Sequence, residues 1–178
     1  MLQHLDHVGI ACRSLEAAIE KYTSVFGLSV TSLEVNEEQG VKEAMLALGG
    51  TPPLLPPDKT PGGLALDGSA GPFGSYVQLL EPLSEDTPVG KFLARRGEGI
   101  HHIGYAVANV TDALATISAG GLVRLIDSRP RHGSLGASIA FLHPADLGGV
   151  LTELVQPSPG SPGSPGSPGG PIRRAASD

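Results

Sequence analysis

The stretch LDHVGIA at residues 5–11 returns as IHHIGYA at residues 100–106, and this repeat decides the fold. The alignment places His7 opposite His102. In the first copy His7, Gly9 and Ala11 share one face of an extended chain, while apolar residues lie between them, which is typical of a β-strand. The repeat therefore indicates two copies of one structural module.

Each copy is followed by an amphipathic stretch that ends at glycine. The first helix is predicted to begin after an N-cap at Ser14 and to stop at Gly27; the second begins after Asn109 and stops at Gly120 and Gly121. Strand-like runs then follow in each half, at residues 40–48, 75–80, 138–142 and 150–155. The order strand, helix, strand, strand, strand, written twice, predicts tandem βαβββ modules.

One domain is expected over residues 1–156, with modules at about 4–82 and 99–156. A short helix at 87–97 links the modules, since proline stands at its first position and glycine at its end.

Two segments are too rich in glycine and proline to pack as regular elements. Residues 51–74 hold 11 Gly or Pro among 24 residues, which predicts a long loop inserted into the first module. Residues 157–178 repeat Ser-Pro-Gly units, and this tail is expected to be disordered.

The composition excludes several function classes. The 178 residues carry a formal net charge of −6, with seven aromatic residues and no Trp, which argues against a nucleic-acid partner. No run approaches 18 apolar residues, so no membrane span is predicted. The amino terminus lacks a basic leader and Cys12 is the single cysteine, which favours the cytoplasm.

Two polar residues stand inside apolar strand sequence, Gln78 in the first module and Glu153 at the equivalent place in the second. Burying such groups without a partner costs several kcal/mol. Together with His7 and His102 they offer two imidazoles, a carboxylate and an amide oxygen, a set suited to a divalent metal with open coordination positions. Their equivalent positions in the repeat favour a metal site over four separate structural roles.

The other histidines, and the two arginines at the end of the linking helix, are interpreted as structural or surface residues. His101 neighbours His102 on the strand, so it is expected to point to the opposite face as a packing or supporting group. Arg95 and Arg96 end the linking helix and complement its dipole, with phosphate binding as an alternative. The other histidines are interpreted as surface or loop residues: His4 before the strand, His132 and His143.

Six segments occur in the order LDHVGIA, EEQGVKEAML, QLLEP, GEGIHHIGYAV, FLHP and GGVLTELV, and together they resemble the methylmalonyl-CoA epimerase family of the vicinal oxygen chelate superfamily. The resemblance runs from about Leu5 to Gln156. It implies a glyoxalase-like α+β fold, in which the two modules form a cupped mixed sheet around a metal site. An acyl-CoA partner, a homodimer and a place in propionate metabolism are also implied.

By resemblance, the ligands of one divalent ion are His7, Gln78, His102 and Glu153. Co²⁺ is the first expectation, and Mn²⁺, Ni²⁺ or Zn²⁺ are alternatives. The resemblance also implies a catalytic base at Glu43, with Glu153 as the second base and Glu38 as a weaker candidate. Such a pair would interconvert (2R)- and (2S)-methylmalonyl-CoA through a metal-stabilised enolate.

Several alternatives stay open at this point. Ala145 stands where relatives commonly have lysine, and residues 135–138 lack a basic residue often found there, so the groups that bind the CoA phosphates are undetermined. The acyl group accepted and the role of residues 51–74 are open too. Rival readings are a related acyl-CoA epimerase, a glyoxalase-like isomerase, a ring-cleaving dioxygenase and a metal-free binding protein.

Overall fold

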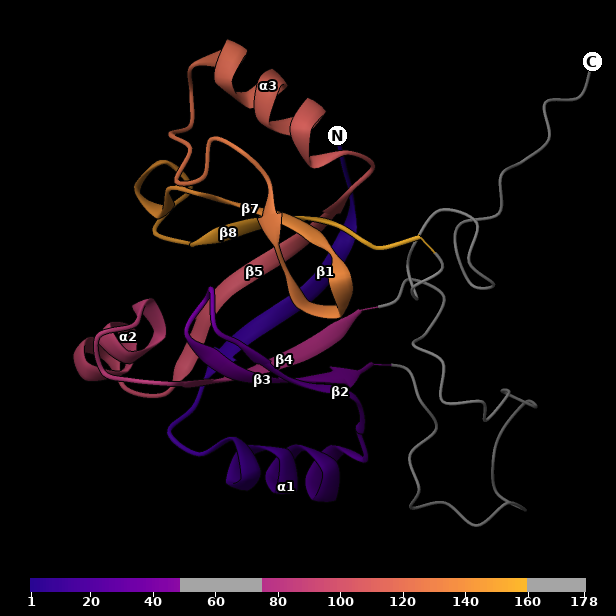
Figure 1. Cartoon of the computed structure of the whole chain (residues 1–178), viewed down its shortest axis with the longest axis vertical. Coiled ribbons are helices and arrows are strands. Elements are labelled where there is room, and N and C mark those ends of the chain that lie inside the picture. Colours follow the sequence, from indigo (N-terminus) through magenta and orange to yellow (C-terminus); the bar gives the residue numbers. More distant parts are fainter. Residues whose placement is uncertain (49–74, 160–178) are drawn as a thin grey trace, which may run out of the picture.

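The computed structural model describes residues 1–48 and 75–159, so the loop expected at 51–74 and the tail beyond Pro159 lie outside the described residues. Eight strands form one curled mixed sheet in the order β2-β3-β4-β1-β5-β8-β7-β6 (Figure 1). The strands are β1 (Leu2–Ala11), β2 (Ser29–Asn36), β3 (Val41–Ala47), β4 (Tyr76–Pro82), β5 (Gly99–Val107), β6 (Arg131–His132), β7 (Ser138–Leu142) and β8 (Thr152–Gln156). The helices are α1 (Leu15–Phe26), α2 (Pro88–Arg96) and α3 (Val110–Gly120), with short 3₁₀ turns η2 (Ser134–Gly136) and η3 (Pro144–Asp146).

The two modules occupy the two halves of this sheet. Strands β1 and β5 pair antiparallel at its centre, and each pairs parallel with the last strand of its own module, β4 or β8. The element orders β1-α1-β2-β3-β4 and β5-α3-β6-β7-β8 confirm the predicted βαβββ repeat and the glyoxalase-like α+β fold. The repeat therefore brings the two LDHVGIA-like strands side by side.

The helix ends follow the expected capping chemistry. The Ser14 side chain accepts a hydrogen bond from the Ala17 amide, and Gly27 ends α1 in the left-handed conformation with φ of 67°. Asn109 and Gly121 do the same for α3. The predicted linking helix is α2, which Thr87 caps.

Three details differ from the expectations. His4 lies within β1 rather than before the strand, because β1 begins at Leu2. His132 belongs to the two-residue strand β6 rather than to a loop. The chain also stays packed beyond the expected domain end at residue 156, since the Ser158 hydroxyl contacts the carbonyl oxygens of Leu135 and Gly136 at 3.2 and 2.5 Å.

The core lies between the sheet and its helices. On the first module α1 packs against a cluster that includes Ala44, Leu46 and Leu79. On the second, α3 packs against the equivalent residues of β7 and β8. Figure 1 shows α1 and α3 at opposite ends of the molecule and α2 at its side. Side chains alternate between the two faces of a strand. The strand residues that alternate with those packed against α1 and α3 therefore point away from the helices, into the curve of the sheet. Among the described residues, no helix has the length and apolar character needed to cross a membrane.

Candidate metal centre and proton-transfer site

The two repeat-equivalent histidines meet at the middle of the sheet. In the β1–β5 register His7 lies opposite Gly104 and His102 lies opposite Gly9. Each imidazole covers the glycine that faces it: a Cβ on Gly9 would lie 2.2 Å from His102 Cε1, and one on Gly104 would lie 2.4 Å from His7 Cε1. The glycines therefore make room for the rings, whose Nε2 atoms are 2.8 Å apart.

The flanking strands add Gln78 and Glu153. Gln78 on β4 and Glu153 on β8 occupy register positions beside these same two glycines, one in each module. Glu153 Oε2 is 2.9 Å from His7 Nε2 and 3.1 Å from His102 Nε2. The four residues named as candidate ligands thus come from the four central strands and point into the curve of the sheet.

This cluster is chemically suited to a divalent ion. The ligand atoms of His7, His102 and Glu153 all lie within 4.8 Å of one another, and the three residues are buried. Gln78 Oε1 is also buried and has no hydrogen-bond partner within the described residues. An orphaned amide oxygen costs about 1–3 kcal/mol, and a cation would relieve that cost. Imidazole nitrogens and hard oxygens suit Co²⁺, Mn²⁺, Ni²⁺ and Zn²⁺ alike, so the donor set does not select among them.

The residue before each histidine sits at a β-bulge. The β1–β5 register slips at Asp6 and again at His101, which are equivalent in the repeat. Asp6 Oδ1 lies 2.8 Å from His7 Nδ1, and His101 Nδ1 lies 3.0 Å from His102 Nδ1. The expectation that His101 points to the opposite face is wrong, because a bulged residue leaves the strict alternation of a strand. The contact with His102 agrees with the supporting role expected for His101. If Asp6 and His101 accept hydrogen bonds from Nδ1 of His7 and of His102, each Nε2 is left free to bind a metal.

The electrostatics of the triad follow from burial and contact. Burial lowers the pKa of His7, but the hydrogen bonds and charges of Asp6 and Glu153 outweigh it and raise that pKa to about 10. Burial raises the pKa of Glu153, yet its contacts with His102 and His7 lower it to about 2. Burial lowers the pKa of His102 despite the opposing effect of Glu153. Without a metal, therefore, His7 holds a proton that a metal must displace.

Glu43 lies in a second polar group, on β3. Its side chain is 1% exposed and accepts hydrogen bonds from Gln78 Nε2 at 2.9 Å and from the Ser134 hydroxyl at 2.7 Å. Burial raises the pKa of Glu43, and the charges of Glu34 and Glu153 add to this rise, while the two hydrogen bonds oppose it. Glu38, the weaker candidate base, is exposed in the turn between β2 and β3.

Ser134 is a site residue that the sequence interpretation missed. It lies in η2 of the second module and reaches Glu43 of the first, while also accepting a hydrogen bond from Gln78 Nε2 at 2.9 Å. Nothing in its local sequence distinguishes it from any loop serine, because the contact exists only once the sheet has curled.

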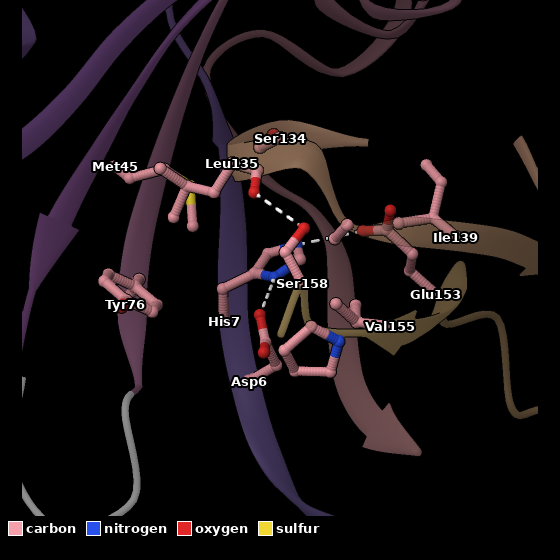
Figure 2. Close-up of a pocket in the computed structure, with 12 residues that line it drawn as sticks. Asp6, His7, Met45, Tyr76, Ser134, Leu135, Ile139, Glu153, Val155 and Ser158 are labelled. Atoms are coloured by element: carbon pink, nitrogen blue, oxygen red, sulfur yellow. Dashed lines mark hydrogen bonds and ion pairs between the residues drawn. The ribbon is translucent and has the colours of Figure 1, made fainter. Parts of the chain in front are cut away.

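A small cavity adjoins the triad. Its volume is about 30 Å³, and His7, Glu153 and Ser134 are among its lining residues. Figure 2 shows His7 between Asp6 and Glu153, with Ser134 and Leu135 of η2 on the other side of His7 from Asp6. A space of this size admits an ion or a water molecule, so a large ligand must approach the triad by another path.

Known proteins resemble this chain in sequence and in overall fold. Residues 6–141 match the family model of the Glyoxalase/Bleomycin resistance protein/Dioxygenase superfamily. A Streptomyces coelicolor methylmalonyl-CoA epimerase variant, solved in complex with 2-nitronate-propionyl-CoA, is 46% identical with a TM-score of 0.74; the match covers 89% of this chain and 99% of that one. A methylmalonyl-CoA epimerase in complex with methylmalonyl-CoA and NH4+ is 45% identical with a TM-score of 0.75, over 93% and 100% of the two chains.

A further relative comes from Cereibacter sphaeroides. It is an ethylmalonyl-CoA/methylmalonyl-CoA epimerase that is 31% identical over 157 residues, which are 88% of this chain and 99% of the relative.

Proposed function

The chain belongs to the methylmalonyl-CoA epimerase family of the glyoxalase/bleomycin resistance protein/dioxygenase superfamily, and we propose on that basis that it interconverts (2R)- and (2S)-methylmalonyl-CoA. The observation that supports this most is the pair of buried carboxylates, Glu43 and Glu153, which come from different modules. Gln78 donates a hydrogen bond to Glu43, and Gln78 and Glu153 lie beside the two glycines under the histidine rings, which supports a shared site.

Epimerisation needs two proton carriers. The hydrogen at C2 of a methylmalonyl thioester lies between two carbonyl groups and is therefore acidic. It must leave one face and return to the other, which a group on each side achieves. Glu43 and Glu153 have environments that move their pKa values apart, upward for Glu43 and to about 2 for Glu153. An acid–base pair needs one protonated and one ionised carboxyl group, and this divergence of the two environments supports such a pairing.

The surrounding side chains orient these groups. Ser134 and Gln78 hold the two oxygens of Glu43, so its carboxylate keeps one orientation. His7, Gln78, His102 and Glu153 would hold one divalent ion, Co²⁺ first, with Mn²⁺, Ni²⁺ or Zn²⁺ as alternatives. When bound, the ion supplies positive charge that stabilises the enolate formed as C2 loses its proton.

The proposal extends to the setting of the protein. An acyl-CoA is its substrate partner, and family resemblance supports a homodimer that serves propionate metabolism. The Cereibacter sphaeroides relative is named for both ethylmalonyl-CoA and methylmalonyl-CoA, so ethylmalonyl-CoA is the second acyl group to test.

The proposed activity can be tested with single epimers. The purified chain, supplied with Co²⁺, should convert (2R)-methylmalonyl-CoA to the equilibrium mixture, as followed by circular dichroism. Removing metal with a chelator should abolish the change and adding Co²⁺ back should restore it. A glutathione hemithioacetal is the comparison substrate. Turnover of the hemithioacetal without epimerisation of either acyl-CoA would replace the epimerase with a glyoxalase-like isomerase.

A further inference from the structure

The aromatic ring of Phe141, on β7, lies beside both candidate ligands of the second module. It meets the His102 ring in a T-shaped arrangement, with centroids 5.5 Å apart and an interplanar angle of 89°. In the β7–β8 register Phe141 is directly opposite Glu153, so the two side chains are neighbours on one face of the sheet. Because Phe141 is buried, the place of its ring limits where His102 and Glu153 can lie.

Methionine stands at the equivalent position in the first module. Met45 lies opposite Gln78 in the β3–β4 register, as Phe141 lies opposite Glu153 in the second module. An unbranched methionine side chain adapts its shape to its surroundings, which a planar ring cannot do. A rigid support beside the ligands is therefore particular to the second module.

The backbone of Phe141 is held by Asp127. The short strand β6 pairs with β7 at Ser138 and Ile139 and does not extend as far as Phe141. The Phe141 amide instead donates a hydrogen bond to Asp127 Oδ2 at 2.9 Å, and its carbonyl oxygen accepts one from the Asp127 amide at 3.2 Å. Asp127 thus takes the place of a strand residue at this edge of the sheet.

Arg131, on β6, binds both Asp127 and the ring of Phe141. Its Nε atom lies 3.3 Å from Asp127 Oδ1, the carboxylate oxygen that does not bind the Phe141 amide. This Nε atom is buried, so water screens the ion pair less than it would at an open surface. The guanidinium carbon lies over the Phe141 ring, 5.8 Å from its centroid, where the negative face of the ring attracts a cation. One guanidinium therefore holds the ring of Phe141 and the carboxylate that fixes its backbone.

We propose that Arg131 is a positioning residue for the metal centre, an inference that rests on the proposed function and extends it. With Asp127, Arg131 holds the Phe141 ring against His102 and beside Glu153. These two ligands thereby keep their places relative to the ligands of the first module. Arg131 acts through Phe141 and is not itself a ligand.

Co²⁺ affinity and the visible absorption spectrum of bound Co²⁺ both depend on ligand geometry and test this role. Arg131→Met removes the charge, and it should shift the spectrum and weaken Co²⁺ binding by about tenfold, as replacing a residue that supports a metal ligand does. Arg131→Lys should restore most of the affinity, because an ammonium group can still pair with Asp127 and lie over Phe141. Wild-type affinity and spectrum in Arg131→Met would overturn the proposal.

Arg124→Met is the matched control. Arg124 belongs to the same module and also forms an ion pair, with Asp146 at 2.8 Å, in a part of the module where Phe141 is not involved. Its loss should leave the affinity and the spectrum of bound Co²⁺ as in the wild type. If Arg124→Met weakens Co²⁺ binding as much as Arg131→Met, the effect belongs to general stability and the positioning role falls.

A double-mutant cycle shows whether Arg131 acts through the ring. Phe141→Leu alone should weaken Co²⁺ binding, and Arg131→Met should add no further loss in that background. Additive losses would contradict a route through Phe141. If Arg131→Met does not fold, Asp127→Asn takes its place in the cycle, since asparagine keeps an oxygen for the Phe141 amide and loses only the ion pair.

Failure of the positioning role can be told apart from failure of the proposed function. If Arg131→Met changes Co²⁺ binding as expected but the wild-type chain epimerises nothing, the positioning role stands and the proposed function falls. If the chain epimerises methylmalonyl-CoA and Arg131→Met binds Co²⁺ as the wild type does, the proposed function stands and the positioning role falls.

Discussion

Two glycines determine whether the histidine rings can meet. Gly9 and Gly104 lie directly under His102 and His7, and neither position has room for a Cβ atom. Each ring can take its position only because the residue opposite it on the neighbouring strand has no side chain. The site therefore requires both histidines and both glycines.

Gly9→Ala should accordingly weaken metal binding. The new methyl group would lie 2.2 Å from the His102 ring, so the ring must move away from His7 and Glu153. We expect at least a tenfold loss of Co²⁺ affinity, measured by competition with a chromophoric chelator, in protein that retains its far-ultraviolet circular dichroism. Gly120→Ala is the matched control, since nothing lies within 4 Å of a Cβ there. Wild-type affinity in Gly9→Ala would show that the rings do not need this gap.

The proton on His7 makes metal binding depend on pH. Its pKa is raised to about 10 in the metal-free protein, so the proton is present at neutral pH and must leave before Nε2 can bind a metal. Co²⁺ affinity should therefore rise by about tenfold per pH unit between pH 6 and 8. Titration calorimetry in buffers of different ionisation enthalpy should show release of close to one proton per ion. Affinity that stays flat over this range would contradict a protonated His7.

At the level of elements, capping residues made the helices predictable and bulges made the strands less so. Ser14 with Gly27 and Asn109 with Gly121 mark the helix ends through local chemistry that the sequence displays. The bulge at His101 leaves no such mark, because it depends on the register between β1 and β5.

The residues of the candidate site likewise fall into those that the sequence predicts and those that only the folded sheet brings together. The two histidines, Gln78 and Glu153 are visible in sequence because the module is repeated, so each residue has an equivalent that points to it. Ser134 has no such partner: it meets Glu43 across the curled sheet, and curvature is a property of the whole sheet.

The hydrogen bond from Ser134 of η2 to Glu43 of β3 should affect the pKa of Glu43. The Ser134 hydrogen bond lowers the pKa of Glu43 against the larger effect of burial, so Ser134→Ala should raise that pKa further. A base must be ionised to remove a proton, and the acid limb of kcat/KM for methylmalonyl-CoA should therefore move to higher pH. Ser24→Ala on the exposed face of α1 is the control and should keep the wild-type profile. If the acid limb of Ser134→Ala stays in place or moves to lower pH, Ser134 does not lower the pKa of the catalytic base.

At the scale of the molecule, the site belongs to neither module alone. The candidate ligands come equally from both halves, and Glu43 of the first module depends on Ser134 of the second. The chain end takes part as well, because Ser158 contacts the backbone of η2.

Truncation should reveal where the functional domain ends. Removing residues 160–178 should leave kcat and KM for methylmalonyl-CoA unchanged, since that composition buries no core. Removing residues 157–178 should slow turnover several-fold, because η2 loses its contacts with Ser158 beside Ser134. Steady-state kinetics of the two truncated proteins gives the comparison. Equal activity in both would show that Ser158 does not support the site.

Epimerisation in D₂O shows directly whether Glu43 and Glu153 are the two proton carriers, when deuterium incorporation and configuration at C2 of methylmalonyl-CoA are followed together. Glu43→Gln should slow interconversion by about 10²- to 10⁴-fold, the usual contribution of a general base. Metal content should stay unchanged, because Glu43 is not a proposed ligand. Exchange should persist only for the epimer whose hydrogen faces Glu153. Glu38→Gln should behave as the wild type, whereas a Glu43→Gln protein that epimerises both substrates at the wild-type rate would show that Glu43 is not a proton carrier.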